Sequence, residues 1–239
     1  MARVRDLSVD ERHAVLDGEV VVGVDEVGRG SLAGPVVVGA VVLREGTPPP
    51  DGLADSKVLS RAQREALVDP ITRWAADWSL GWSGADEIDA WGLRVALAVA
   101  ATRALDALRV RPGVALVDGS VNLLSAPGAL DVVAPGPPVL SYADLSHRAV
   151  VRGDATCASI AAASVLAKVH RDRAMDDLAR AHPAYGWTSN KGYGAPAHLA
   201  ALRALGPTVL HRRSWALPEW PSLDADRGSA RPGGHEAAE

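Results

Sequence analysis

The sequence predicts an α/β protein in which helices cover a mixed sheet. Short valine-rich runs alternate with longer segments whose apolar residues recur at helical spacing. A loop joins the first two runs, which is typical of an antiparallel pair, whereas helical segments separate the later runs, as parallel strands require. Of the 239 residues, 48% are hydrophobic, which supports a well-filled core.

The individual elements follow from this pattern. We expect strands over residues 20–24, 35–43, 78–83, 114–117 and 149–152, where β-branched and aromatic residues concentrate. We expect helices over 85–109, 155–181 and 196–205, where apolar or alanine-rich segments run between breakers such as Gly206-Pro207.

Two capping-box patterns mark helix starts. Ser8 and Glu11 have the required spacing near the N-terminus, where nothing else indicates a function. Ser60 and Gln63 repeat the spacing before a helical segment, which Pro70 is expected to interrupt because proline lacks the amide hydrogen of a helix interior.

Two further segments are expected to lie outside the core. Residues 126–144 are rich in proline, glycine and alanine and predict a long excursion. Residues 221–239 contain almost nothing apolar and predict a disordered tail. We find no internal repeat, and expect residues 1–220 to form one domain.

Composition excludes several classes of protein. The N-terminus has no apolar signal core and no run of about 18 apolar residues occurs, so we expect a cytoplasmic protein that does not enter a membrane. A net charge of −4 argues against non-specific coating of nucleic acid, although a local basic groove is compatible with it. The single cysteine, Cys157, cannot form an internal disulfide and is expected to be a small buried residue, so any metal needs oxygen or histidine ligands.

Carboxylates stand at the ends of three predicted elements. Asp25 and Glu26 end the first valine-rich run, Asp118 ends the run at 114–117, and Asp154 precedes the long alanine-rich helix. In α/β folds such positions meet at one edge of the sheet, where binding sites lie. Four carboxylates gathered there would repel one another unless a hard divalent cation such as Mg²⁺ or Mn²⁺ were bound.

Each acidic position also has a plain structural interpretation. The glycines after Glu26 would make a bulged hairpin with solvent-facing acids, Asp118 a turn, and Asp154 a helix N-cap. The same glycines resemble a dinucleotide-binding fingerprint, but that motif needs a helix to begin there, whereas Pro35 begins a strand. Recurrence at three element ends favours a common site.

Taken together, these residues resemble ribonuclease HII. Six motifs occur in order between about residues 20 and 216: Asp25-Glu26-Val27-Gly28-Arg29-Gly30, Asp55-Ser56-Lys57, Asp118-Gly119, Gly153-Asp154-Ala155 with 160–168, Lys191-Gly192-Tyr193 and His211-Arg212-Arg213-Ser214-Trp215.

The resemblance implies a ribonuclease H-like fold with a central mixed five-stranded sheet, flanking helices and a helical C-terminal part. It implies that Asp25, Glu26, Asp118 and Asp154 are catalytic and bind Mn²⁺ or Mg²⁺, two ions during catalysis. The sister type III enzymes end this set with glutamate and carry an extra N-terminal domain, which does not fit into the 20 residues before the first strand.

The implied activity is endonucleolytic cleavage of the RNA strand of RNA/DNA hybrids, including 5′ of a single ribonucleotide in duplex DNA, leaving 3′-hydroxyl and 5′-phosphate ends. Two cations about 4 Å apart activate the water, so no nucleophilic side chain is required. Because neighbouring strand residues point to opposite faces, we expect the strand to end at Asp25 and Glu26, or a backbone carbonyl of this pair to join the coordination.

The resemblance also implies how substrate is recognised. Gly28-Arg29-Gly30 would contact the 2′-hydroxyl, since missing side chains allow close backbone approach, and Tyr193 would stack on the sugar beyond the RNA–DNA junction. A packed surface aromatic is the alternative for Tyr193. Phosphate contacts are expected from Lys57, Lys168, Lys191, Arg212 and Arg213.

Not every basic or histidine side chain in these motifs needs to contact substrate. For Lys168 and Arg171, a solvated helix face or an ion pair with Asp172 remains open. His211 is expected to be structural.

The chain also departs from the family pattern. Ser31 stands where the family often has proline, which predicts a less rigid loop, although this substitution touches no proposed metal ligand. The 35 residues between Asp118 and Asp154 are more than expected. The tail shows no clamp-binding motif, so a sliding-clamp partner is unsupported, and we expect a monomer. A non-catalytic hybrid-binding protein and a DNA-junction nuclease are the rival interpretations.

Overall fold

The computed structural model describes residues 4, 8–44, 46–119, 124, 142 and 145–220, so the predictions for the 126–144 excursion and the 221–239 tail lie outside the described residues, apart from Tyr142. Five strands form one sheet in the order β3-β2-β1-β4-β5. Their bounds are β1 Val21–Val27, β2 Val36–Val42, β3 Asp77–Ser83, β4 Val114–Asp118 and β5 Ser146–Val150.

The sheet is mixed, as predicted. β2 pairs antiparallel with both β1 and β3, whereas β4 pairs parallel with both β1 and β5. β1 and β2, which a loop joins, are antiparallel as predicted. β2 and β3 are also antiparallel although the helix at Arg61–Trp74 lies between them, so the expectation that helical connections join only parallel strands is wrong for this pair.

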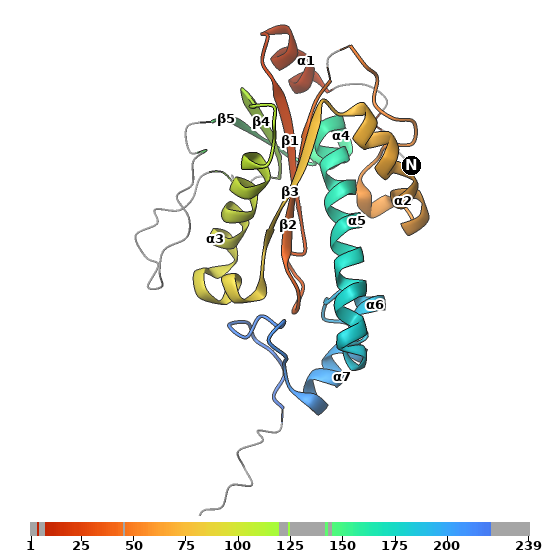
Figure 1. Cartoon of the computed structure of the whole chain (residues 1–239), viewed down its shortest axis with the longest axis vertical. Helices are drawn as coiled ribbons and strands as arrows, with labels where there is room; N and C mark the ends of the chain where they lie inside the picture. The colour runs from red at the N-terminus through yellow and green to blue at the C-terminus, as the bar shows by residue number, and fades with distance from the viewer. Residues whose placement is uncertain are drawn as a thin grey trace, which may run out of the picture.

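Helices cover both faces of the sheet (Figure 1). On one face lies α3, Ala85–Asp106, and on the other lies α5, Ala158–Ala181, with α2, Arg61–Trp74, packed beside it. Glycines in the strands permit this close packing: a Cβ at Gly81 would lie 1.8 Å from the Ala100 carbonyl oxygen of α3, and one at Gly39 would lie 2.6 Å from that of Ala163 in α5.

The short elements complete the described chain. The turn η1, Ser56–Val58, precedes α2, and α4, Gly153–Thr156, precedes α5. The C-terminal part is helical, as implied, with η3 Pro183–Tyr185, α6 Trp187–Asn190 and α7 Pro196–Leu205. Among the described residues no helix is both long and apolar enough to cross a membrane.

The first helix, α1 at Val9–Leu16, has the predicted capping box. The carboxylate of Glu11 is fully buried and has a second role. It accepts hydrogen bonds from the amides of Ala158 and Ser159 at the start of α5, at 3.1 and 2.8 Å. One glutamate therefore caps two helices. Cys157 is buried beside it, as expected.

Three helix predictions need correction. α2 continues through Pro70, which removes only the hydrogen bond to Ala66 on the exposed side of that helix. α3 breaks at Gly92, whose φ of 77° is left-handed. The long helix begins at Ala158 rather than at residue 155, because Cys157 is extended and separates it from α4.

Two strand predictions also differ. The last strand is Ser146–Val150, earlier than expected, because Arg152 adopts the left-handed conformation that begins α4. The first strand does not end at the acids but continues to Val27, since both acids pair in register with β2.

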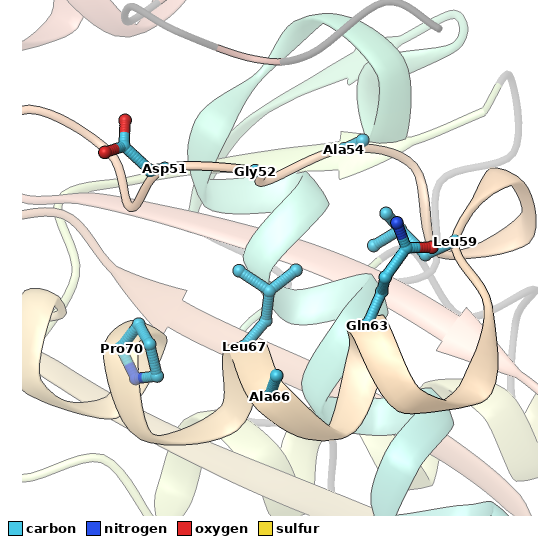
Figure 2. A pocket seen from close by; sticks show the side chains of 8 residues that line it. All are labelled: Asp51, Gly52, Ala54, Leu59, Gln63, Ala66, Leu67 and Pro70. Carbon is cyan, nitrogen blue, oxygen red and sulfur yellow. The ribbon is translucent and has the colours of Figure 1, made fainter.

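A cavity of about 270 Å³ lies between the loop after β2 and α2 (Figure 2). Figure 2 shows Leu67 and Gln63 of α2 on one side of it and the backbone of residues 51–54 on the other. Gln63 Oε1 is already used, because it accepts the Ser60 amide in the capping box.

Candidate active site

The ends of three parallel strands bring the acidic residues to one edge of the sheet. Asp25 lies in β1 and Asp118 is the last residue of β4, with Val24 opposite Val117 in the register. Asp154 follows β5 by four residues. This is the shared edge at which parallel strands present their carboxyl ends.

Asp154 lies in the first turn of α4, so the N-cap interpretation of it is wrong. The N-cap of α4 is Arg152, which makes no side-chain capping bond. The amide of Asp154 instead donates to Asp118 Oδ1 at 3.2 Å, and its own carboxylate accepts from Lys57 Nζ at 2.5 Å. The backbone amide of Asp154 thus ties the two acidic residues together, and the ammonium group of Lys57 in η1 pairs with the Asp154 carboxylate.

Asp25 is almost fully buried, with 4% of its surface exposed. Burial, followed by the nearby charges of Glu26 and Asp118, raises the pKa of Asp25 to about 8, although a hydrogen bond from Ser164 opposes the shift. Ser164 is held in turn by the hydroxyl of Ser56 at 2.8 Å. The carboxylates therefore already repel one another within this site.

Glu26 is the next residue of the same strand and pairs with Arg29, whose Nη1 lies 3.0 Å from Glu26 Oε1. Both acids nevertheless line one cavity of about 490 Å³. Since β1 continues past them, the expectation that the strand ends there fails, and coordination through a backbone carbonyl stays a prediction.

The donor set fits a hard divalent cation, because it consists of carboxylate oxygens that destabilise one another when unneutralised. Asp25, Glu26, Asp118 and Asp154 are the residues that would hold it. As they stand, no three described histidine, cysteine, aspartate or glutamate side chains converge closely enough to bind an ion. The ammonium group of Lys57 contacts the Asp154 carboxylate, one of the four groups that would bind the cation.

The cavity collects most of the predicted site residues. It is lined by Asp25, Glu26, Gly28, Arg29, Gly30, Lys57, Asp118, Lys168 and Tyr193. Sequence reasoning missed Ser56, Arg64 and Ser164, which also line it. The two serines lie inside motifs that carry the resemblance, and that position was the available signal. Arg64 carried none.

Two of the predicted phosphate ligands are placed elsewhere. Arg212 is fully buried and its guanidinium donates to the carbonyls of Gly28 and Arg29, both at 2.7 Å, so direct contact with a phosphate is a wrong expectation. Lys191 is 8% exposed and forms an ion pair with Asp176 on α5. The donors of both side chains therefore bind groups of the protein itself and do not face the cavity.

Lys168 lines the cavity and forms an ion pair with Asp172 at 2.7 Å, the alternative that the sequence left open. Arg171 does not lie on a solvated face, because it is fully buried. Tyr193 is half-buried at the cavity wall, with the Arg171 guanidinium 5.5 Å from its ring centre.

His211 is buried and structural, as expected. Its Nε2 lies 3.1 Å from Nε2 of His198, and its Nδ1 accepts from the Thr208 amide at 2.9 Å. The other nitrogen of His198, Nδ1, lies 2.9 Å from the carbonyl oxygen of Tyr193. The two histidines thus join the C-terminal segment to the loop that carries Tyr193.

Comparison with known proteins agrees with this geometry. Residues 22–217 match the family Ribonuclease HII. The chain is 48% identical to a ribonuclease HII from Paracoccus denitrificans over 88% of this chain and 91% of the relative. It is 42% identical to one from Streptomyces avermitilis, over 91% and 87%.

Solved structures show the same fold. The ribonuclease H2 from Pyrococcus horikoshii superposes with a TM-score of 0.65 at 28% identity, covering 82% of this chain and 93% of that one. The family match spans the cavity and every acidic residue around it. The chain therefore belongs to the ribonuclease HII family, whose enzymes hydrolyse the RNA strand of RNA/DNA hybrids.

Proposed function

We propose that the chain cleaves RNA/DNA hybrids and also incises duplex DNA on the 5′ side of a single embedded ribonucleotide, as a ribonucleotide-repair nuclease. One observation carries the proposal: residues 28–30 and Tyr193 line the same cavity as Asp25 and Asp118. The groups suited to recognising a ribose and those suited to holding a cation are therefore adjacent.

Asp25, Glu26, Asp118 and Asp154 hold the divalent cations, Mn²⁺ or Mg²⁺, in this proposal. Two such ions, when bound, supply activation of water and stabilisation of the leaving 3′ oxygen, which gives 3′-hydroxyl and 5′-phosphate ends. The protein supplies position. The amide of Asp154 fixes the Asp118 carboxylate, and the Ser164 hydroxyl fixes that of Asp25.

Ribose recognition rests on the exposed backbone at Arg29 and Gly30. A Cβ at Gly30 would meet nothing within 4 Å, so the protein's own packing does not require glycine there. Contact with a 2′-hydroxyl would require glycine there, because the backbone can approach the minor groove closely only where no side chain is present. Lys57 and Lys168, which line the cavity, contact phosphates on either side.

A labelled DNA duplex containing one ribonucleotide, incubated with the protein and Mg²⁺ or Mn²⁺, tests the proposal. We expect a single incision 5′ of the ribonucleotide, with 3′-hydroxyl and 5′-phosphate ends. An all-DNA duplex is the control and stays intact. Incision of the control would favour a DNA nuclease, and binding of a hybrid without any cleavage would favour a non-catalytic binding protein.

We further propose that residues 1–220 act as one catalytic domain, as a monomer in the cytoplasm. The single sheet and its two helical layers support the first point. Size-exclusion chromatography with light scattering tests the second, and a dimer mass would contradict it.

A further inference from the structure

Two arginines lie fully buried behind the cavity, and neither forms a salt bridge with a described carboxylate. Arg171 comes from α5 and Arg212 from the C-terminal segment, and both have zero exposed surface. Burial, and for Arg212 also the charge of Arg171, lowers the pKa of each guanidinium. Placing two like charges together in the interior is costly unless their donors are satisfied.

Backbone carbonyls of two substrate-facing segments satisfy most of these donors. Arg212 binds the carbonyls of Gly28 and Arg29, as described above. Arg171 Nε donates to the carbonyl of Pro35 at 2.8 Å, and its Nη1 donates to that of Lys191 at 3.1 Å. One guanidinium thus holds the loop that contains residues 28–30, and the other joins this loop to the segment that contains Tyr193.

Ser31 connects the two arginines. Its fully buried hydroxyl oxygen accepts from Arg171 Nη2 at 2.7 Å and from Arg212 Nη2 at 3.0 Å. The same hydroxyl donates to the carbonyl of Gly28 at 2.9 Å. These hydrogen bonds restrain the loop, contrary to the expectation that Ser31 leaves it less rigid, and none of the three partners is a proposed metal ligand.

We propose that Arg171, Arg212 and Ser31 are positioning residues that fix the Gly28-Arg29-Gly30 loop relative to Tyr193, and thereby set the selectivity for an RNA–DNA junction. This inference rests on the function proposed above. The backbone supports the same link, since the amide of Leu32 donates to the carbonyl of Gly192 at 2.7 Å.

The two classes of substrate depend on this spacing to different degrees. A single ribonucleotide presents one 2′-hydroxyl and one junction at which RNA is followed by DNA, so both segments must engage at the same place. A long RNA/DNA hybrid presents a 2′-hydroxyl at every step and can be cleaved away from any junction. Loosening the spacing should therefore penalise the single ribonucleotide more than the hybrid.

The main test is Ser31→Ala, which removes the shared acceptor and leaves both arginines in place. We expect kcat/KM on a single-ribonucleotide duplex to fall about tenfold relative to that on a long hybrid, as expected for one hydrogen bond to a charged group. The loss should appear mainly in KM. Arg212→Met, which also frees the carbonyls of Gly28 and Arg29, should lower the same ratio further.

Val99→Ala is the control, because Val99 is buried in α3 on the other face of the sheet. It should lower the melting temperature while leaving the ratio between the two substrates unchanged. An equal fall of the ratio in Val99→Ala would mean that lost stability alone explains the effect, and would overturn the proposal.

Hydrogen exchange gives a readout that does not depend on activity. In Ser31→Ala, amides of residues 28–34 and of 190–195 should exchange faster together, because Arg171, which loses an acceptor in this variant, also holds the carbonyl of Lys191. Faster exchange in 28–34 alone, or an unchanged substrate ratio in an active enzyme, would overturn the positioning role. A wild-type protein that cleaves neither substrate would instead overturn the proposed function.

Discussion

Nζ of Lys57 lies 2.5 Å from Oδ2 of Asp154, so a carboxylate of the proposed metal site is already paired with an ammonium group. Burial opposes its charge, but the hydrogen bond and charge of Asp154 raise the pKa of Lys57 above its usual value. A divalent cation that uses Asp154 must compete with this lysine.

Replacing Lys57 by methionine should therefore tighten metal binding. We expect the apparent Kd for Mg²⁺ or Mn²⁺, obtained from melting temperatures at increasing metal concentration, to fall about two- to fivefold, since the lysine side chain is largely exposed. The metal-free melting temperature should fall, because Asp154 loses its partner. Lys57→Arg keeps the charge and serves as control. An unchanged Kd in the methionine variant would contradict the competition.

Asp25→Asn should stabilise the metal-free protein in a pH-dependent way. The folded pKa is about 8 and the ordinary value 3.8, so between these values the folded state holds a proton that the unfolded state has released. Stability of the wild type should fall as pH rises across this window, by up to about 1.4 kcal/mol per pH unit.

The asparagine variant lacks this dependence, so its advantage should grow from pH 4 to pH 8 and then level off. Urea unfolding at several pH values in the presence of a chelator measures it. A constant difference between the two proteins would show that Asp25 is not the responsible group. Asp154→Asn is the less suitable variant for this purpose, because it breaks the contact with Lys57.

Gly30→Ala should separate substrate approach from folding. We expect its melting temperature to match the wild type, since the new methyl group meets open space, while KM for a single-ribonucleotide substrate rises about tenfold or more. Gly28→Ala is the matched comparison. There φ is +91° and the new Cβ would lie 2.3 Å from Arg171 Nε, so stability itself should fall. An undisturbed KM in Gly30→Ala would argue against backbone contact with the ribose.

Tyr193→Ala should weaken incision at a single ribonucleotide more than it lowers the melting temperature. The ring is half-buried at the cavity wall and packs under cationic groups rather than in a core cluster. Tyr193→Phe keeps the stacking surface and should retain most activity. If the alanine variant is unstable but fully active, Tyr193 is a packing residue, the alternative considered from the sequence.

Acid should destabilise the C-terminal part through His211. Burial, then the neighbouring His198, lowers the pKa of His211 to about 4 from an ordinary 6.5. Between these values the unfolded state binds a proton that the folded state excludes, so stability should fall as pH drops from 6.5 towards 4. Asp25 contributes with the opposite sign in this range. The test is therefore the change in unfolding free energy between pH 6.5 and pH 4, measured for wild type and for His211→Gln. As the pH drops, the variant should lose less stability, or gain more, than the wild type.

Much of the fold was predictable because its signals are local. Valine-rich runs specify strands, and the rule that parallel strands present their carboxyl ends at one edge is enough to bring Asp25, Asp118 and Asp154 together. The positions at which helices break were harder to predict from the sequence. Nothing in a glycine at position 92 or a cysteine at 157 distinguishes a tolerated residue from a break, since tertiary packing decides the outcome.

The acidic residues of the site could be predicted from the sequence, but the buried arginines that hold the surrounding loops could not. Arg171 beside Asp172 looks like an exposed ion pair on a helix, yet it is turned into the protein towards carbonyls more than 130 residues away. Arg212 shows the same limit. A buried guanidinium and a phosphate-binding one have the same sequence signature, because the difference lies in which carbonyl groups the fold places nearby.

Glu11 sets a limit on how far the chain can be shortened. None of the described residues that line the cavity precedes Asp25, so a chain beginning at the first strand would retain every proposed ligand. It would lose the acceptor for the amides of Ala158 and Ser159, which begin α5 directly after the turn that carries Asp154. Trimming from the N-terminus should therefore stop before Ser8, and a truncation beyond it would damage the active centre from a distance.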